Sequence, residues 1–198
     1  MCPPACFRRS AARSRGFTLV EMMVTVALLA VLAALAVPSI RSVIMRNSFS
    51  TIGNEFTGAL MRARTEAVAK NICTTMCMSD TVDAATPFCK QTGSDWQVGW
   101  MVFLNPACNV DYGKNASTQA VAPGDLLILR GPGQADYQLK AATSTRRVNF
   151  NARGNSGMGA IDRFDLDHTD HDMAVKLGFN ICLDVVGRTR TIAAATSC

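Results

Sequence analysis

An apolar run near the N-terminus restricts this chain more than any other feature of its sequence. It covers the 21 residues from 17 to 37, and Glu21 is its only charged residue. As a helix the run would be about 31 Å long at about 1.5 Å per residue, which is enough to cross the hydrocarbon core of a bilayer. A carboxylate at membrane depth costs about 2.5–3.5 kcal/mol on insertion scales. We therefore expect Glu21 to have a partner, and the run itself offers none.

The apolar run could be a transmembrane anchor or a secretory signal peptide. Both explain its length, but neither explains Glu21. The preceding segment carries four arginines: Arg8, Arg9, Arg13 and Arg15. In a plain transmembrane anchor these charges would keep the N-terminus in the cytoplasm. In a secretory signal peptide they would form the basic region, and the small residues Ala34 and Ala36 would allow cleavage after Ala36. The second interpretation gives a secreted, soluble β domain stabilised by disulfides.

A third interpretation rests on a resemblance. Residues 16–21, Gly-Phe-Thr-Leu-Val-Glu, resemble the class III leader of type IV prepilins and pseudopilins, a short basic segment that ends in Gly. In that family the prepilin peptidase cuts after the Gly on the cytoplasmic side, and the new N-terminal Phe is N-methylated. The resemblance implies removal of residues 1–16 by a cut between Gly16 and Phe17, with N-methylation of Phe17. In a filament, the ammonium group of a neighbouring subunit's Phe17 would neutralise Glu21.

The formal net charge of +5 does not survive this processing. The leader contains four of the 20 basic residues and none of the 15 acidic ones, so the mature chain has 16 basic and 15 acidic residues. Its net charge is then +1. An anionic partner such as nucleic acid must therefore be met by a local cluster of basic residues.

Helical periodicity continues beyond the apolar run, over residues 38–71. Pro38 lacks a backbone donor, so it should kink the helix rather than end it. Apolar residues recur at spacings of three and four: Met45, Phe49, Ile52, Phe56, Leu60, Ala63 and Ala67. This stripe predicts that one face of the helix is covered by the rest of the protein.

From residue 72 the pattern changes to short β-prone segments separated by turn residues. The predicted strands are 72–78, 97–104, 126–130, 147–150, 175–183 and 190–194. The segments 79–94, 105–124 and 131–145 are expected to be surface loops. The chain is therefore expected to be an α+β protein, with a long N-terminal helix packed on a small antiparallel β-sheet domain over residues 72–198.

Later segments narrow the resemblance to the FimT/GspH family of minor pilins and pseudopilins. They are residues 63–67, 96–103, 148–154 and 187–190, with Cys77 and Cys89 between the first two. The resemblance implies a pilin-like, non-enzymatic subunit with no cofactor, held in the inner membrane with its N-terminus in the cytoplasm and its β domain in the periplasm. The implied partners are the prepilin peptidase and other pilins or pseudopilins, met through the N-terminal helix. It leaves open whether the subunit primes or caps a type IV pilus or the pseudopilus of a type II secretion system.

Six cysteines remain after the leader is removed, and an even number in an exported domain favours disulfides. Six cysteines allow 15 full pairings. We expect Cys77 to pair with Cys89 across the first long loop and Cys182 with Cys198 to hold the C-terminal strand, which leaves Cys73 and Cys108 as a third pair. A zinc site is disfavoured because only Cys73 and Cys77 are closely spaced.

Both histidines lie in an acidic segment, residues 161–172, which the family pattern does not explain. His and Asp side chains can bind Zn²⁺ or Ca²⁺, but the spacing here is irregular. We expect a solvated loop without a metal. No nucleophile motif accompanies the segment, so no catalytic residue is expected either.

The segment Gly187-Arg188-Thr189-Arg190 contains two closely spaced arginines and is the strongest candidate for a binding site in the sequence. If 175–183 and 190–194 form a hairpin, residues 184–187 make its turn, and Arg188 and Arg190 emerge on one face. In FimT proteins of naturally competent bacteria, a GRxR motif binds DNA during uptake, which implies a phosphate contact without sequence preference. Alternatively, the arginines only protect an edge strand from aggregation. Arg146, Arg147 and Arg153 would extend the basic patch if the fold places them nearby.

Overall fold

The computed structural model describes residues 16–194 and 196–198, without the side chains of residues 36–39. The described residues form two compact units, which divide between Ile44 and Met45. One helix, α1 (Leu19–Lys70), contributes to both, so the predicted continuation beyond Pro38 is confirmed. It begins at a cap in which the Glu21 N–H donates to Thr18 Oγ1 (3.2 Å). It ends where Asn71 takes a positive φ of 54°.

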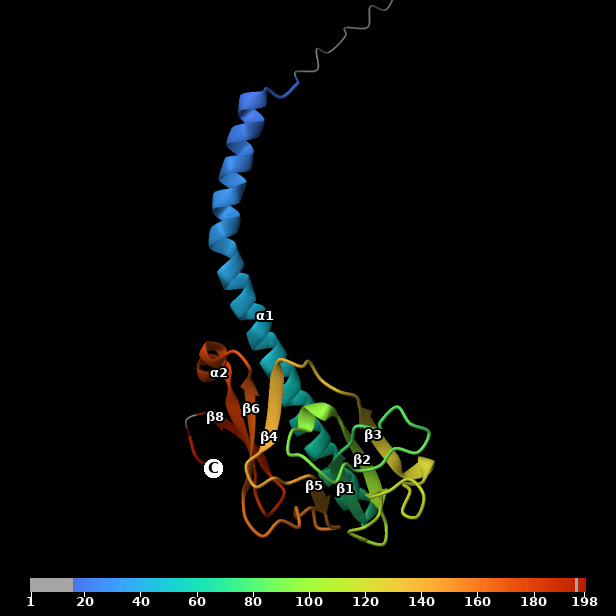
Figure 1. The fold of residues 1–198 in the computed structure, drawn as a ribbon. Coiled ribbons are helices and arrows are strands. Elements are labelled where there is room, and N and C mark those ends of the chain that lie inside the picture. The colour runs from blue at the N-terminus through green and yellow to red at the C-terminus, as the bar shows by residue number, and fades with distance from the viewer. Residues whose placement is uncertain (1–15, 195) are drawn as a thin grey trace, which may run out of the picture. The chain divides into compact units, whose positions relative to one another are not determined.

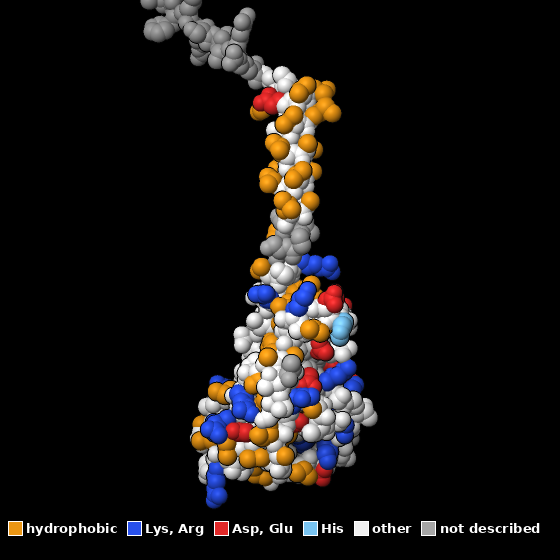
Figure 2. All heavy atoms as spheres, turned by 90° about the vertical axis from the view of Figure 1, so that its left-hand side faces the viewer, with side chains coloured by type: hydrophobic (Ala, Val, Ile, Leu, Met, Phe, Trp, Pro, Cys, Tyr) orange, Lys and Arg blue, Asp and Glu red, His pale blue; other side chains and the backbone are white. Residues whose placement is uncertain are grey.

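The start of α1 has no protein cover over its described residues up to residue 35. All described side chains from residue 16 to residue 35 are exposed, including Phe17 at 78%. Figure 2 shows apolar side chains along this segment. Among the described residues, α1 is long and apolar enough to cross a membrane by length and composition. Such a surface needs lipid or other helices around it in order to be stable.

The second unit contains two four-stranded antiparallel sheets (Figure 1). The first sheet has the order β3-β2-β1-β5: Leu126–Arg130, Trp100–Asn105, Cys73–Met78 and Arg147–Phe150. The second has the order β4-β6-β7-β8: Tyr137–Ala141, Asp162–His168, Phe179–Leu183 and Thr189–Ala193. Short helices complete the unit: η1 (Trp96–Val98), η2 (Pro123–Asp125) and α2 (His171–Leu177).

The predicted apolar stripe of α1 forms the core of the second unit together with both sheets. All seven residues of the stripe are buried. Phe56 lies at the centre, with its ring 5.2 Å from that of Trp96, 5.4 Å from that of Trp100 and 4.9 Å from that of Phe164. Burying a side chain of this size contributes about 1.5–3 kcal/mol. The stripe therefore joins the helix to β2 and β6 in one hydrophobic cluster.

Two predicted loops were wrong because they contain strands. The segment 131–145 includes β4, and the acidic segment 161–172 includes β6 and the start of α2. In β6 the buried Phe164 and Leu166 alternate with Arg163, Asp165 and Asp167, the period of a strand with one covered face. The acidic residues of the outer face obscured this alternation.

Two predicted strands begin three or four residues later than expected. Residues 175–177 belong to α2, and β7 starts at Phe179 after Gly178, whose N–H donates to Ala174 O (2.8 Å) and ends the helix. Residues 97–98 belong to η1, and β2 starts at Trp100 after Gly99, which has a positive φ of 119°. In both cases a glycine separates a short helix from the strand.

Candidate functional site

The predicted processing and assembly residues lie at the exposed start of α1. Gly16 and Phe17 precede the helix, and Glu21 lies in its first turn. No ion pair among the described residues includes Glu21. The carboxylate is therefore available to a cation from outside this chain, and Phe17 is accessible in front of it.

The second predicted site is the turn between β7 and β8, and Asp184 organises it. The Arg188 N–H donates to Asp184 Oδ1 (2.7 Å), and Arg188 Nε donates to Asp184 Oδ2 (3.1 Å). Burial tends to raise the pKa of Asp184, but the hydrogen bonds from Arg188 outweigh it and leave this pKa below its usual value. The charge of Arg188 is thus partly neutralised within the turn.

Gly187 packs this turn against the rest of the second unit. It has a positive φ of 78°, and a Cβ there would lie 2.1 Å from the carbonyl oxygen of Gly154. Arg64 of α1 donates from Nε to the same oxygen (3.0 Å). The Ser156 N–H also donates to Val185 O (3.1 Å). Two segments that carry the family resemblance, 148–154 and 187–190, therefore meet at α1.

Arg188 and Arg190 are exposed and line one hollow of about 470 Å³. Its other lining residues are Ile161, Cys182, Asp184 and Thr189. Arg190 lies opposite Cys182 in the β7–β8 pair, and its Nη2 donates to Cys198 O (2.6 Å). Two guanidinium groups beside one hollow can bind a phosphate, although each already has an acceptor within the chain.

Three disulfides join the cysteines in the pairs expected from the sequence: Cys73–Cys108, Cys77–Cys89 and Cys182–Cys198. The first connects the start of β1 to the loop after β2, and the second connects β1 to the following loop. The third holds the C-terminal residue against β7. Each bond thus ties a loop or a chain end to a strand.

A family model described as "Type II transport protein GspH" matches residues 53–180, which is more than half of the chain. The chain belongs to the GspH family. A second model, the prokaryotic N-terminal methylation motif, matches residues 11–37. This GspH-family protein is therefore a minor pilin or pseudopilin of the GspH/FimT type. The GspH match ends before the β7–β8 turn, so it does not include Arg188 and Arg190.

The solved structures similar to this chain are pilins. The type IV minor pilin FimU of Pseudomonas aeruginosa PAO1, in crystals of space group P21, is 18% identical with a TM-score of 0.53, over 76% of this chain and 92% of FimU. The P65 crystals of FimU give 15% identity and a TM-score of 0.51, over 74% of this chain and 94% of FimU. These likenesses show a shared pilin-like fold. No curated protein matches this GspH-family chain.

The three further arginines do not form one patch with Arg188 and Arg190. Of the three, only Arg153 lies in a turn that contacts the β7–β8 turn, through Gly154 and Gly187. Arg146 and Arg147 line a different hollow, together with Lys90 and Lys114. The two lysines were missed in the sequence because each lies in a long loop whose path only the disulfides and strand pairing determine.

The acidic segment has a structural role in this GspH-family fold. The ring of His168 packs against that of Tyr137 at 4.8 Å, and Asp170 caps α2 by accepting from the Asp172 N–H (3.1 Å). Across the described residues, no three His, Cys, Asp or Glu side chains lie close enough together to hold a metal ion. Asp162 is buried, and the other carboxylates of this segment lie on the outer face of β6 and at the start of α2.

Proposed function

We propose that this GspH-family protein is a non-enzymatic filament subunit that waits in the inner membrane until it is assembled. Residues 17–37 would span the membrane, and the β domain would lie in the periplasm. After the prepilin peptidase cuts between Gly16 and Phe17, the subunit would join a type IV pilus or a type II secretion pseudopilus. Its role there would be to prime or cap the filament.

One observation carries this proposal: the described residues 16–35 expose an apolar helix with a single acid, Glu21. In lipid or in a filament core the apolar side chains are covered. The acid would be neutralised only when the N-terminal ammonium of a neighbouring subunit arrives, so assembly would relieve the cost of burying its charge. A secreted soluble protein would have no use for this acid.

N-terminal mass spectrometry of the protein from its own membranes tests the proposal. We expect a chain that begins with N-methylated Phe17 and that keeps its leader when the peptidase gene is deleted. Gly16→Val should also retain the leader, whereas Ala36→Val, which changes the signal-peptidase site, should be processed normally. A mature chain that begins at Val37 would show a secreted protein instead.

A second candidate function is DNA capture through the β7–β8 turn. It is favoured by the exposure of Arg188 and Arg190 beside one hollow. The opposing consideration is that Asp184 and the main-chain oxygen of Cys198 already accept from these side chains. Any DNA contact would therefore be led by phosphate and insensitive to sequence.

A further inference from the structure

A second basic hollow, of about 340 Å³, lies beside strand β5 at the edge of the first sheet. Four cationic side chains line it: Lys90, Lys114, Arg146 and Arg147. The other lining residues are Cys89, Gln91 and Thr145, none of them acidic. The cations come from two long loops and from the start of β5, so the fold brings together charges that are far apart in the sequence.

The nearest carboxylates neutralise only the two lysines. Lys90 pairs with Asp80, and Lys114 Nζ lies 2.5 Å from Asp111 Oδ1. Neither Arg146 nor Arg147 is part of an ion pair among the described residues. When these two ion pairs are counted, the four cations that line the hollow retain a net charge of +2.

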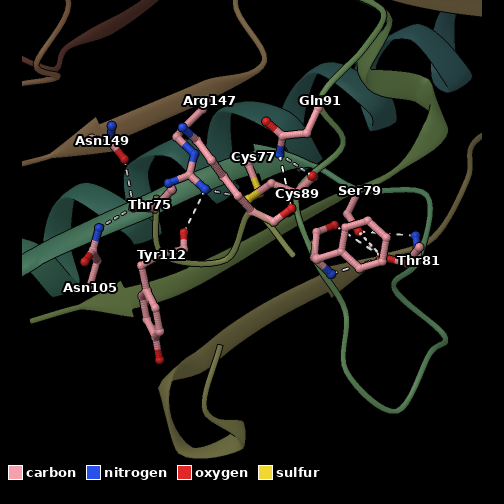
Figure 3. The surroundings of a disulfide bond; sticks show 12 residues. Thr75, Cys77, Ser79, Thr81, Cys89, Gln91, Asn105, Tyr112, Arg147 and Asn149 are labelled. Atoms are coloured by element: carbon pink, nitrogen blue, oxygen red, sulfur yellow. Dashed lines mark hydrogen bonds between the residues drawn. A yellow bond between two sulfur atoms is a disulfide. The ribbon is translucent and has the colours of Figure 1, made fainter. Parts of the chain in front are cut away.

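Arg147 is held rigidly next to the Cys77–Cys89 disulfide (Figure 3). Its Nη2 donates to Tyr112 O (2.7 Å) and contacts Cys89 Sγ (3.1 Å), and its Nη1 donates to Val110 O (2.9 Å). Burial lowers the pKa of Arg147 to about 10, against a smaller opposing effect of Asp111, so the guanidinium remains charged at neutral pH. The acceptors are neutral, so they orient this charge without cancelling it.

Arg146, by contrast, is free to meet a ligand. Its side chain is exposed, and its bond within the chain is a long one, from Nη1 to Gly93 O (3.3 Å). A fixed, partly buried cation beside an exposed one is a favourable arrangement for an anion, because the fixed charge costs no ordering entropy. The planar guanidinium and the two ammonium groups suit the several oxygens of a phosphate.

We propose that this hollow is an oxyanion site that takes a phosphate group. The phosphate could be free, as in pyrophosphate, or part of a nucleic-acid backbone, and the chemistry of recognition is the same. The site shares no lining residue with the hollow of Arg188 and Arg190. It also does not depend on filament assembly.

A third hollow lies beside both basic ones, since it shares lining residues with each. It has a volume of about 290 Å³, shares Thr145 and Arg147 with the proposed phosphate site, and shares Ile161 with the hollow of Arg188 and Arg190. Its lining includes the buried carboxylate of Asp162, whose negative charge disfavours a phosphate in this third hollow. A nucleic-acid strand would therefore be gripped at the two ends of this path, whereas a free phosphate would occupy only the first site.

The experiment uses the full-length processed protein in a neutral detergent at low salt. Pyrophosphate binding is measured by calorimetry, and binding of a labelled oligothymidylate by fluorescence anisotropy. We expect Lys114→Gln with Arg146→Gln to weaken pyrophosphate binding by about tenfold, because two charge-assisted contacts are lost. On the oligonucleotide, the same pair should flatten the log-log salt slope by about 1.4.

Two controls separate this site from general charge and from the β7–β8 turn. Lys140→Gln with Lys176→Gln removes two positive charges elsewhere and should leave both affinities unchanged. Arg188→Gln with Arg190→Gln removes the cations of the other candidate phosphate hollow, and in that background the Lys114 and Arg146 substitutions should weaken pyrophosphate binding by the same factor as in the parent. Lys114→Arg with Arg146→Lys keeps the charges and should retain binding, which attributes a loss in the Gln variant to charge, and circular dichroism checks that the Gln variant is folded. The proposal is wrong if neither ligand binds the parent protein. It is also wrong if the variant Lys114→Gln with Arg146→Gln binds both ligands as tightly as the variant Lys140→Gln with Lys176→Gln does.

Discussion

Gly187 lies so close to the carbonyl oxygen of Gly154 that a Cβ at position 187 would stand 2.1 Å from that oxygen. This contact fixes the β7–β8 turn on α1, since Arg64 donates to the same oxygen. The glycine of the GRxR motif is therefore needed for packing, whatever the arginines after it do.

Gly187→Ala should destabilise the second unit by about 1–3 kcal/mol through its positive φ alone, and the clash with the Gly154 oxygen should add to this cost. Gly58→Ala is the matched control: this glycine is exposed in α1 with open space around it, and alanine there should stabilise by about 0.5–1 kcal/mol. Denaturant unfolding in a neutral detergent measures both. Equal stability of the two variants would show that the Gly154 contact relaxes easily.

The Asp184–Arg188 interaction should make stability depend on pH in acid. The folded pKa of Asp184 is lower than its unfolded value, so its contribution is complete above about pH 4 and is lost as the pH falls through the folded pKa. Asp184→Asn should therefore cost about 1 kcal/mol at pH 7 and less at pH 3. Asp83→Asn, at an exposed position, serves as the reference. A cost that stays the same at both pH values would mean that the turn does not depend on the carboxylate charge.

Glu21→Ala should leave membrane insertion intact and reduce incorporation into filaments. The variant removes the cost of burying a charge but also the attraction to a neighbour's Phe17 amine. A loss of about 1.4 kcal/mol or more at each contact would lower incorporation by about tenfold or more. Membrane and sheared-filament fractions are compared with those of Glu66→Ala, a variant outside the apolar run. Normal incorporation of Glu21→Ala would give this acid another role.

The disulfide pairs are tested by non-reducing peptide mapping of the exported protein. We expect the linked peptides Cys73–Cys108, Cys77–Cys89 and Cys182–Cys198. The Cys182–Cys198 loop has a sequence separation of 16, and closing a loop of this size contributes about 3 kcal/mol in the chain-entropy model. Cys182→Ser with Cys198→Ser should lower stability by a similar amount. Free thiols at Cys182 and Cys198 in the parent would show that the predicted Cys182–Cys198 disulfide does not form.

The DNA proposal for the β7–β8 turn has its own comparison. Neutralising two to four phosphates would give a log-log salt slope of roughly −2 to −4 on duplex DNA, and Arg188→Gln with Arg190→Gln should flatten it by about 2. The double variant should still fold, since both side chains are exposed, but loss of the bond from Arg188 Nε to Asp184 should lower stability by about 1 kcal/mol or less. DNA-shift and pilus-assembly assays are run on the same full-length preparations. Unchanged DNA binding together with normal assembly would leave the arginines as edge-strand residues.

The sequence alone determined the features that depend on neighbouring residues. The apolar run with Glu21 identified the membrane or filament helix, and the spacing from Met45 to Ala67 identified the face that α1 buries. Both are local patterns, because helical periodicity repeats every three to four residues. Strands β3 and β5 were predicted with their observed bounds because turn residues flank them.

Only the tertiary structure decided which distant segments meet. Strands β4 and β6 are stable because they pair with each other and cover α1, and their sequences are too polar to indicate this alone. The contact of Gly187 with Gly154 and the burial of Arg147 beside Cys89 depend on strand register and on two disulfide-bonded loops. The physical reason is that a non-local contact depends on the whole set of pairings that closes the chain between its partners, and no short stretch of residues contains that information.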